Sequence, residues 1–164
     1  MVLPSLLPQP MQEADYQAVH ALSRSLGRNA EPARFGVEGC QLVLKDSQDK
    51  LLGWAKASWW DPDDELAPAG FYLSGVEIAA DFQQHGLASI LTTARLEWIA
   101  HRADRAWCVV NAQNTASLAL QRSFGFREIC RAPQFGSVQF TGGSGLLLCK
   151  EVTPSNRASA DRKK

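Results

Sequence analysis

The chain has 164 residues, 45% of them hydrophobic, and its 17 basic residues balance its 17 acidic ones. A chain of this length can bury a core without disulfides, and a zero net charge argues against a general nucleic-acid binder, which carries a basic excess. No stretch has the roughly 18 uninterrupted apolar residues of a membrane span. We therefore expect neither a nucleic acid nor a membrane among its partners.

The cysteines and histidines indicate neither disulfides nor a metal site. Each of the four cysteines lies in an apolar, strand-like run outside any C-x-x-C pair, which predicts buried free thiols. The three histidines lack metal-ligand spacing, so we expect no metal. The N-terminus has no positive region and contains prolines, unlike a signal peptide. A cytoplasmic, reducing setting is the default expectation.

The N-terminal half predicts a helix followed by antiparallel strands. Tyr16, Val19 and Leu22 recur at helical spacing, and Gly27 ends the pattern. A polar link at 46–50 between two apolar runs is typical of a hairpin. In chain order, the expected elements are a weak strand at 2–7, a helix at 13–26, a short helix at 32–35, strands at 40–45 and 51–60, an acidic loop at 61–68 and a strand at 70–78.

The C-terminal half alternates helices with strands. Leu87, Leu91 and Trp98 form the apolar stripe of a long amphipathic helix. A strand, a helix and another strand in succession predict a parallel pair with the helix crossing one face. The expected elements are a helix at 86–101, a strand at 106–110, a helix at 114–124, a strand at 126–130, a glycine-rich loop at 132–145 with a strand at 138–140, and a strand at 146–152.

This order predicts an α/β fold: a mixed, mostly antiparallel sheet of six to seven strands with a parallel pair in its middle, flanked by about four helices. We expect one domain over residues 1–153 and a disordered basic tail at 154–164. Ligands of such sheets bind beyond the carboxyl ends of the parallel strands. Residues 83–88 and 111–114 lie at these two ends.

The turn at residues 83–88 is the best candidate for a ligand site. A small-residue turn that leads directly into a helix leaves several backbone N–H groups unpaired, and the helix dipole adds partial positive charge there. Such a helix start binds anions, and phosphate is the usual one.

Two motifs resemble those of the GNAT family of acyl-CoA-dependent N-acyltransferases. Gln83-x-x-Gly86-x-Ala88 is similar to the family pattern Arg/Gln-x-x-Gly-x-Gly/Ala, although Ala80 replaces a proline usual just before it. The second motif begins at Asn114, 31 positions after Gln83, and ends with the Gly-Phe pair at 125–126 after a helix. Residues 70–126 carry the resemblance, and the flanks match only in element order.

The resemblance implies a GNAT fold, with a splayed central parallel pair, and acetyl-CoA (coenzyme A) as co-substrate. It places the pyrophosphate on backbone N–H groups at the start of the helix and the pantetheine arm along the preceding strand. The implied coenzyme-binding residues are Ile78, Ala80, Gln83, Gln84, His85, Gly86, Leu87, Ala88, Ser89, Asn114 and Ser117. At His85 the backbone N–H is the implied binding group, and the imidazole ring need not take part in the chemistry.

Glu77 is the candidate base for deprotonating an attacking amine, with an ordinary exposed strand glutamate as the equal alternative. Alternation places its side chain opposite Val76 and Ile78. A backbone N–H near Ile78 would hold the oxyanion. Many family members carry a tyrosine, proposed to protonate the leaving thiolate, where this chain has Gln121, which cannot act as an acid. Ser117 is a candidate hydrogen-bond donor to that thiolate.

The acceptor residues are less defined. Phe35, Trp59 and Trp60, with Arg34 and the carboxylates of the acidic loop, suit a cationic amine. The alternative is that the tryptophans are mainly core and that the acidic loop is a solvated turn.

The predicted function is acetyl transfer to a small-molecule or protein amine, by a monomer or homodimer. The alternative is a non-catalytic acyl-CoA-binding sensor or interaction module of the same fold, which Gln121 favours and Glu77 opposes. A structural domain that binds no nucleotide is a third reading, opposed by the turn at 83–89. The glycine-rich residues 136–145 suit either an acceptor-side loop or a dimer edge.

Overall fold

The computed structural model describes residues 6–30 and 39–155. The chain divides into two compact units: Met1–Ala57 with Ser74–Arg95 (the first unit), and Ser58–Leu73 with Leu96–Lys164 (the second unit). The α-helices are α1 (Tyr16–Ser25), α2 (Leu87–Ala100) and α3 (Thr115–Ser123). The strands are β1 (Gln9–Pro10), β2 (Cys40–Lys45), β3 (Leu51–Trp60), β4 (Gly70–Ile78), β5 (Arg105–Asn111), β6 (Arg127–Ala132), β7 (Gln134–Phe135), β8 (Val138–Gln139) and β9 (Gly145–Glu151).

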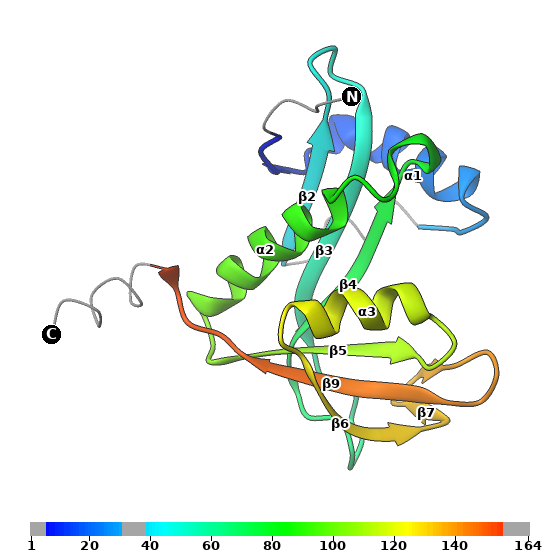
Figure 1. Ribbon diagram of the computed structural model, residues 1–164, viewed down its shortest axis with the longest axis vertical. Coiled ribbons are helices and arrows are strands. Elements are labelled where there is room, and N and C mark those ends of the chain that lie inside the picture. Colours follow the sequence, from blue (N-terminus) through cyan, green and yellow to red (C-terminus); the bar gives the residue numbers. More distant parts are fainter. Residues whose placement is uncertain (1–5, 31–38, 156–164) are drawn as a thin grey trace, which may run out of the picture. The chain divides into compact units, whose positions relative to one another are not determined.

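The strands confirm the predicted mixed sheet. Seven of them run in the order β1-β2-β3-β4-β5-β9-β6, and β7 and β8 form a separate two-stranded sheet. β4 and β5 are parallel and pair at Tyr72 and Trp107, whereas β9 is antiparallel to both β5 and β6 (Figure 1). The described residues contain three α-helices; the short helix expected at 32–35 lies outside them.

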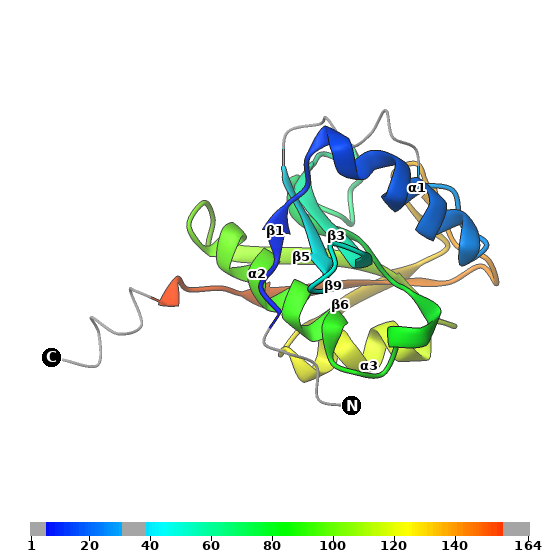
Figure 2. The ribbon, with the colours of Figure 1, turned by 90° about the horizontal axis from the view of Figure 1, so that it is seen from above.

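In the first unit, helices α1 and α2 cover opposite faces of the β2–β3 hairpin (Figure 2). Neighbouring residues of a strand point to opposite faces. Val43 accordingly packs with Val19 of α1, whereas Leu44 packs with Leu87 and Leu91 of α2. The apolar stripe of α2 that the sequence predicts is therefore the part that buries this face of the sheet.

The first strand differs from the sequence prediction. Of the strand expected at 2–7, residues 2–5 lie outside the described residues, and Leu6 and Leu7 are not in a strand. The first described strand is β1 (Gln9–Pro10), which pairs with Val43 and Leu42. Proline lacks the N–H that a ladder needs, but it is tolerated on an edge strand, where β1 lies.

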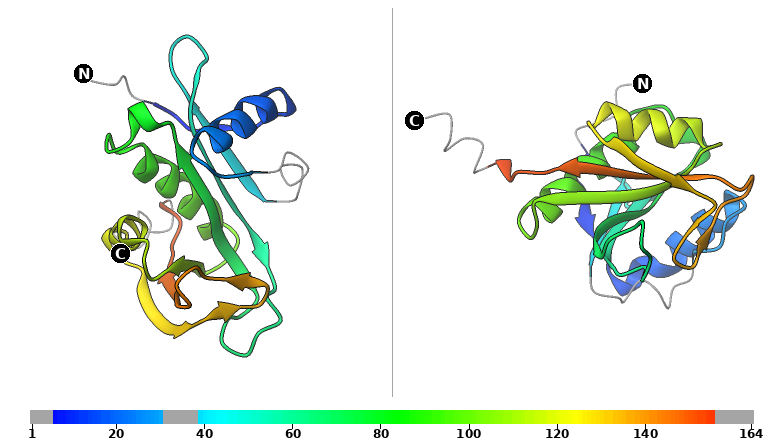
Figure 3. Two further views of the ribbon diagram at one scale, coloured as in Figure 1. Left: turned by 90° about the vertical axis from the view of Figure 1, so that its right-hand side faces the viewer. Right: turned by 90° about the horizontal axis from the view of Figure 1, so that it is seen from below.

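In the second unit, α3 covers one face of β5, β9 and β6, and the β7–β8 hairpin lies over the other (Figure 3). Phe135 of β7 is fully buried against Tyr72 and Leu147. The hairpin lies within the expected loop at 132–145. β8 falls within the strand expected at 138–140, whereas the sequence reasoning missed β7.

Close packing explains why two positions of the glycine-rich segment 136–145 are glycine. A Cβ on Gly136 would lie 2.6 Å from the Pro62 carbonyl oxygen, and one on Gly142 would lie 2.2 Å from the Gln113 amide nitrogen. Gly136 also donates its N–H to the Asp64 carboxylate at 2.8 Å. Gly136 thus packs against and hydrogen-bonds to the acidic loop at 61–68, which precedes β4.

Arg95 is the largest fully buried side chain of the described residues. Its Nη1 donates to the carbonyl of Lys56 in β3 at 3.0 Å and to that of Gly75 in β4 at 3.1 Å. Nη2 donates to the Thr92 hydroxyl at 3.2 Å. The guanidinium therefore ties α2 to the backbone of two neighbouring strands.

We expect Arg95→Met to lower the free energy of unfolding by about 2–4 kcal/mol, because it leaves buried carbonyls without donors. The measurement is urea unfolding at equilibrium. Arg102→Met is the control: this exposed arginine lies over the Trp98 ring at 3.9 Å, and its loss should lower stability by less than about 1 kcal/mol. Equal losses for the two variants would contradict the role of Arg95.

The buried Asp15 forms an ion pair with the half-buried Lys45, whose Nζ lies 2.7 Å from the Asp15 carboxylate. Burial alone would raise the pKa of Asp15. The hydrogen bonds from Lys45 and from the Gln12 N–H outweigh burial and hold this pKa below its ordinary value. Because the folded pKa is lowered, the contribution to stability is present above the unfolded pKa near 3.9 and is lost as the pH falls through the folded pKa.

Asp15→Asn should therefore lower the free energy of unfolding by about 1–3 kcal/mol at pH 7, and this difference should shrink between about pH 5 and pH 2. Urea unfolding of both proteins over this pH range measures the effect. Glu13→Gln, at an exposed acid two residues earlier, is the control and should change little at any pH. A difference between wild type and Asp15→Asn that stays constant down to pH 2 would contradict the assignment.

Candidate functional site

The turn before α2 presents a run of free backbone donors. Gln84 and Gly86 adopt left-handed conformations, with φ of +64° and +80°. Within the described part of the chain, the N–H groups from Gln84 to Ser89 have no acceptor. The next one, of Ile90, donates to the Gly86 carbonyl at 3.2 Å. Six consecutive free N–H groups at the positive end of a helix dipole form an anion site.

The side chains of the turn leave this site open. A Cβ built on Gly86 would meet no atom of the described residues within 4 Å, so none of them fills the space next to it. The ring of His85 lies 2.7 Å from the Gln83 carbonyl, and the Gln83 amide donates to the Ile78 carbonyl at 3.1 Å. Leu87 is buried and anchors the first turn of α2. The residues present therefore fit a phosphate group bound by the backbone.

Glu77 is not an ordinary exposed strand glutamate, since its side chain is only 6% exposed. One carboxylate oxygen accepts from the Trp54 indole N–H at 2.8 Å, and the other accepts from the Ser23 hydroxyl at 3.1 Å. Arg28 Nη1 lies 3.9 Å from the second oxygen. The two hydrogen bonds fix the orientation of the carboxylate at the end of β4, and Arg28 adds a longer-range ion pair.

The predicted alternation around Glu77 is confirmed. Ile78 and Val76 pack in the core cluster that contains Leu87, whereas Glu77 bonds to Trp54 in the cluster under α1. The next N–H, of Ala79, donates to Leu52 of β3 at 2.8 Å. Since successive N–H groups of a strand point to opposite edges, that of Ile78 points away from β3.

In the second unit, Asn114 is the N-cap of α3. Its side-chain oxygen accepts the N–H of Ser117 at 3.1 Å. The nitrogen of the same amide has no acceptor among the described residues, so it can still donate to a ligand. Asn114 is exposed and Ser117 is half-buried, so both side chains retain access to a ligand.

Gln121 lies on the buried side of α3 and is only 4% exposed. Its side-chain oxygen is the one fully buried side-chain polar atom without a hydrogen-bond partner in the described ranges. A buried unpaired polar atom typically costs 1–3 kcal/mol. No titratable proton stands at this position.

The profile of the acetyltransferase (GNAT) family matches residues 8–126. The chain belongs to this family. No curated protein matches the chain at a significant level.

Three solved structures illustrate the shared GNAT fold. Ribosomal-protein-S18-alanine N-acetyltransferase from Escherichia coli has a TM-score of 0.72 and 16% identity, over 92% of this chain and 96% of that one. Phosphinothricin acetyltransferase from Sinorhizobium meliloti, in complex with AcCoA, has a TM-score of 0.72 and 12% identity, over 93% and 92%. NAA60 from Arabidopsis thaliana, in complex with a bisubstrate analogue, has a TM-score of 0.72 and 15% identity, over 92% and 100%.

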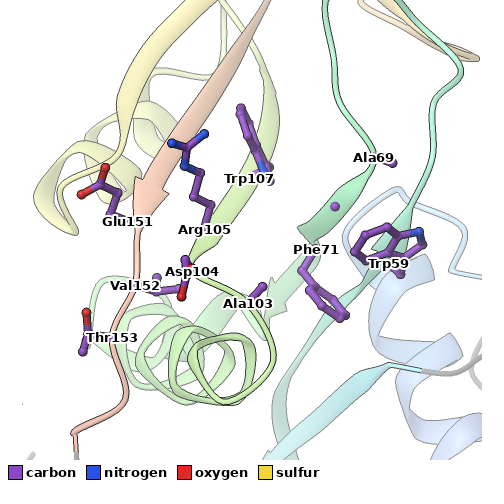
Figure 4. Close-up of a pocket in the computed structure, with 11 residues that line it drawn as sticks. Trp59, Ala69, Phe71, Ala103, Asp104, Arg105, Trp107, Glu151, Val152 and Thr153 are labelled. Carbon is purple, nitrogen blue, oxygen red and sulfur yellow. The ribbon is translucent and has the colours of Figure 1, made fainter. Parts of the chain in front are cut away.

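The predicted acceptor residues of this GNAT protein have different surroundings. Trp60 stacks edge-on against Tyr72 at 4.9 Å beside a core cluster, and Trp59 is 59% exposed and lines a pocket (Figure 4). Phe35 lies outside the described residues. The Asp64 carboxylate accepts the N–H groups of Gly136 and Leu66, which lower its pKa. Among the described residues, Trp59 and Trp60 therefore have separate environments, and their role in acceptor binding stays a prediction.

Sequence reasoning missed the residues around Glu77. The sequence pattern did not indicate that Trp54, Ser23 and Arg28 surround Glu77. No local spacing marks them, because Ser23 lies 54 positions and Trp54 lies 23 positions from Glu77. The one available signal was an acidic residue inside an apolar strand, which needs buried partners.

Two further findings concern metals and membranes. Across residues 6–30 and 39–155, no three histidine, cysteine, aspartate or glutamate side chains lie close enough to hold a metal ion. None of the helices in these ranges is long and apolar enough to cross a membrane.

Proposed function

We propose that this GNAT acetyltransferase uses acetyl-CoA and transfers its acetyl group to an amine. The observation that carries the proposal is the run of six free N–H groups from Gln84 to Ser89, which suits a pyrophosphate. The acetyl-CoA complex of the S. meliloti acetyltransferase supports the choice of coenzyme.

Residues on both sides of this turn complete the proposed coenzyme site. Ile78 and Ala80 would offer backbone groups to the pantetheine arm, and Asn114 and Ser117 would contribute side chains. The set is Ile78, Ala80, Gln83, Gln84, His85, Gly86, Leu87, Ala88, Ser89, Asn114 and Ser117. The bound thioester supplies the acetyl group and a thiolate leaving group.

Glu77 is the proposed base. An amine with a pKa near 10 is mostly protonated at neutral pH and must lose a proton before or during attack. Each carboxylate oxygen has two lone pairs, so Glu77 can accept a proton, directly or through water, while Trp54 and Ser23 hold it. The Ile78 N–H, which points away from β3, would stabilise the oxyanion.

Gln121 supports a second candidate, an acyl-CoA-binding module without turnover. A glutamine cannot protonate a thiolate, although a thiol with a pKa near 8.5 leaves without full protonation. Ser117 is the proposed hydrogen-bond donor in that case. A thiol-release assay with acetyl-CoA and a panel of amines separates the two candidates, since only an enzyme releases coenzyme A at a rate that depends on the amine.

We expect Gly86→Glu to weaken acetyl-CoA binding by about tenfold or more, because a carboxylate would face the phosphates. Calorimetry with the folded variant measures the change. Gly143→Glu is a matched control: Gly143 has a φ of +78° and a Cβ there would also meet no atom within 4 Å, so backbone strain and added charge are the same. An unchanged affinity for Gly86→Glu, or an equal loss for Gly143→Glu, would contradict the backbone phosphate site.

With an amine that the panel identifies, Glu77→Gln should lower kcat by about 100-fold while the KM for acetyl-CoA changes little. Asp15→Asn is the control, because it removes another buried carboxylate of the first unit and should leave kcat within about twofold. Steady-state kinetics of the folded variants measures both. A kcat for Glu77→Gln within a few-fold of wild type would rule out Glu77 as the base.

A further inference from the structure

A pocket lies in the second unit, at the beginnings of β4 and β5. It has a volume of about 630 Å³ and is lined by residues of four chain segments (Figure 4). Asn114 follows the other end of β5, seven residues of extended strand away, or roughly 20 Å. The pocket is therefore not part of the coenzyme site proposed above. Neither the proposed acetyl transfer nor the binding of acetyl-CoA explains its lining.

One side of the pocket is aromatic. Trp59 meets Phe71 edge-on with ring centroids 5.1 Å apart, and Phe71 meets Trp98 in the same way at 5.4 Å. Arg102 covers the far face of this stack, 3.9 Å from the Trp98 ring. The stack holds Trp59 in place although this large ring is 59% exposed. Such a fixed, exposed ring suits the apolar body of a ligand.

The opposite side is charged. Arg105 and Glu151 are directly opposite each other in the β5–β9 ladder, and Asp104 lies between them and the aromatic side (Figure 4). Within the described part of the chain, none of these three side chains has an oppositely charged partner within 4 Å. The pocket therefore offers one cation and two carboxylates that are free to pair with a ligand.

Trp107 lies between the two sides. A Cβ on Gly70 would lie 3.1 Å from its indole nitrogen, so only glycine lets the ring edge approach β4 without displacement. The indole N–H has no acceptor in the described residues, and it can donate to an oxygen of the same group that Arg105 binds.

We propose that this pocket binds a free amino acid with a large apolar side chain. Arg105 and the Trp107 N–H receive the carboxylate, Asp104 and Glu151 receive the ammonium group, and Trp59 with Phe71 packs against the side chain. A purely cationic or purely anionic ligand would leave charges of one sign in the pocket unused. Charge-assisted hydrogen bonds at both ends of the head group make the zwitterion the best match.

The test is an NMR titration of the full-length protein with four probes that share one ring: L-phenylalanine, phenethylamine, 3-phenylpropionate and N-acetylphenylalaninamide. The chain has five tryptophans, whose indole N–H signals are assigned with single Trp→Phe variants. We expect L-phenylalanine to shift the signals of Trp59 and Trp107 saturably and to leave that of Trp54 in place. Its affinity should exceed that of each other probe by about fivefold or more.

Arg105→Gln should remove the preference for L-phenylalanine over phenethylamine, and Trp59→Ala should weaken every probe. Arg127→Gln, at an exposed arginine of β6 outside the pocket, is the matched control and should change neither. An unshifted Trp54 signal shows that each variant is folded. The proposal is overturned if no probe shifts Trp59 and Trp107 saturably, if phenethylamine or 3-phenylpropionate binds as tightly as L-phenylalanine, or if Arg127→Gln has the effect expected of Arg105→Gln.

Discussion

The backbone at the start of α2 carries six N–H groups for which residues 6–30 and 39–155 provide no acceptor. This arrangement depends on two constraints of the first unit. Leu87 and Leu91 are buried against the β2–β3 hairpin and fix where the helix begins. The left-handed residues Gln84 and Gly86 then turn the chain so that no carbonyl lies within reach of these donors. Burial of the helix face thus creates the open anion site at its end.

The catalytic half of the proposed site depends on a different interaction. A buried carboxylate is stable only with donors around it, and Trp54 and Ser23 supply them to Glu77. The same donors determine which lone pairs remain for a substrate proton. In the proposed reaction, Gln121 could not protonate the leaving thiolate, because an amide N–H is far too weak an acid. Glu77 favours the enzyme and Gln121 favours the acyl-CoA-binding module.

Much of the fold followed from local patterns. The apolar stripe of α2, the hairpin link at 46–50 and the strand–helix–strand order are short-range signals, and the elements they predicted are present. The described strand at Gln9–Pro10 was not predicted, because its position depends on pairing with Val43, about thirty residues away. The hydrogen-bond partners of Glu77 and the pocket beside Trp59 were missed for a similar reason, since each joins segments that are distant in sequence.

The sequence by itself determined the family, the order of the elements and the coenzyme motif, because Gln83, Gly86 and Asn114 act through backbone geometry that is encoded locally. Only the tertiary structure decided that Glu77 is buried and hydrogen-bonded, and that Trp59 faces a charged pocket while Trp60 packs against the core. Burial and charge pairing are properties of neighbours in space, and strand pairing chooses those neighbours across the whole chain.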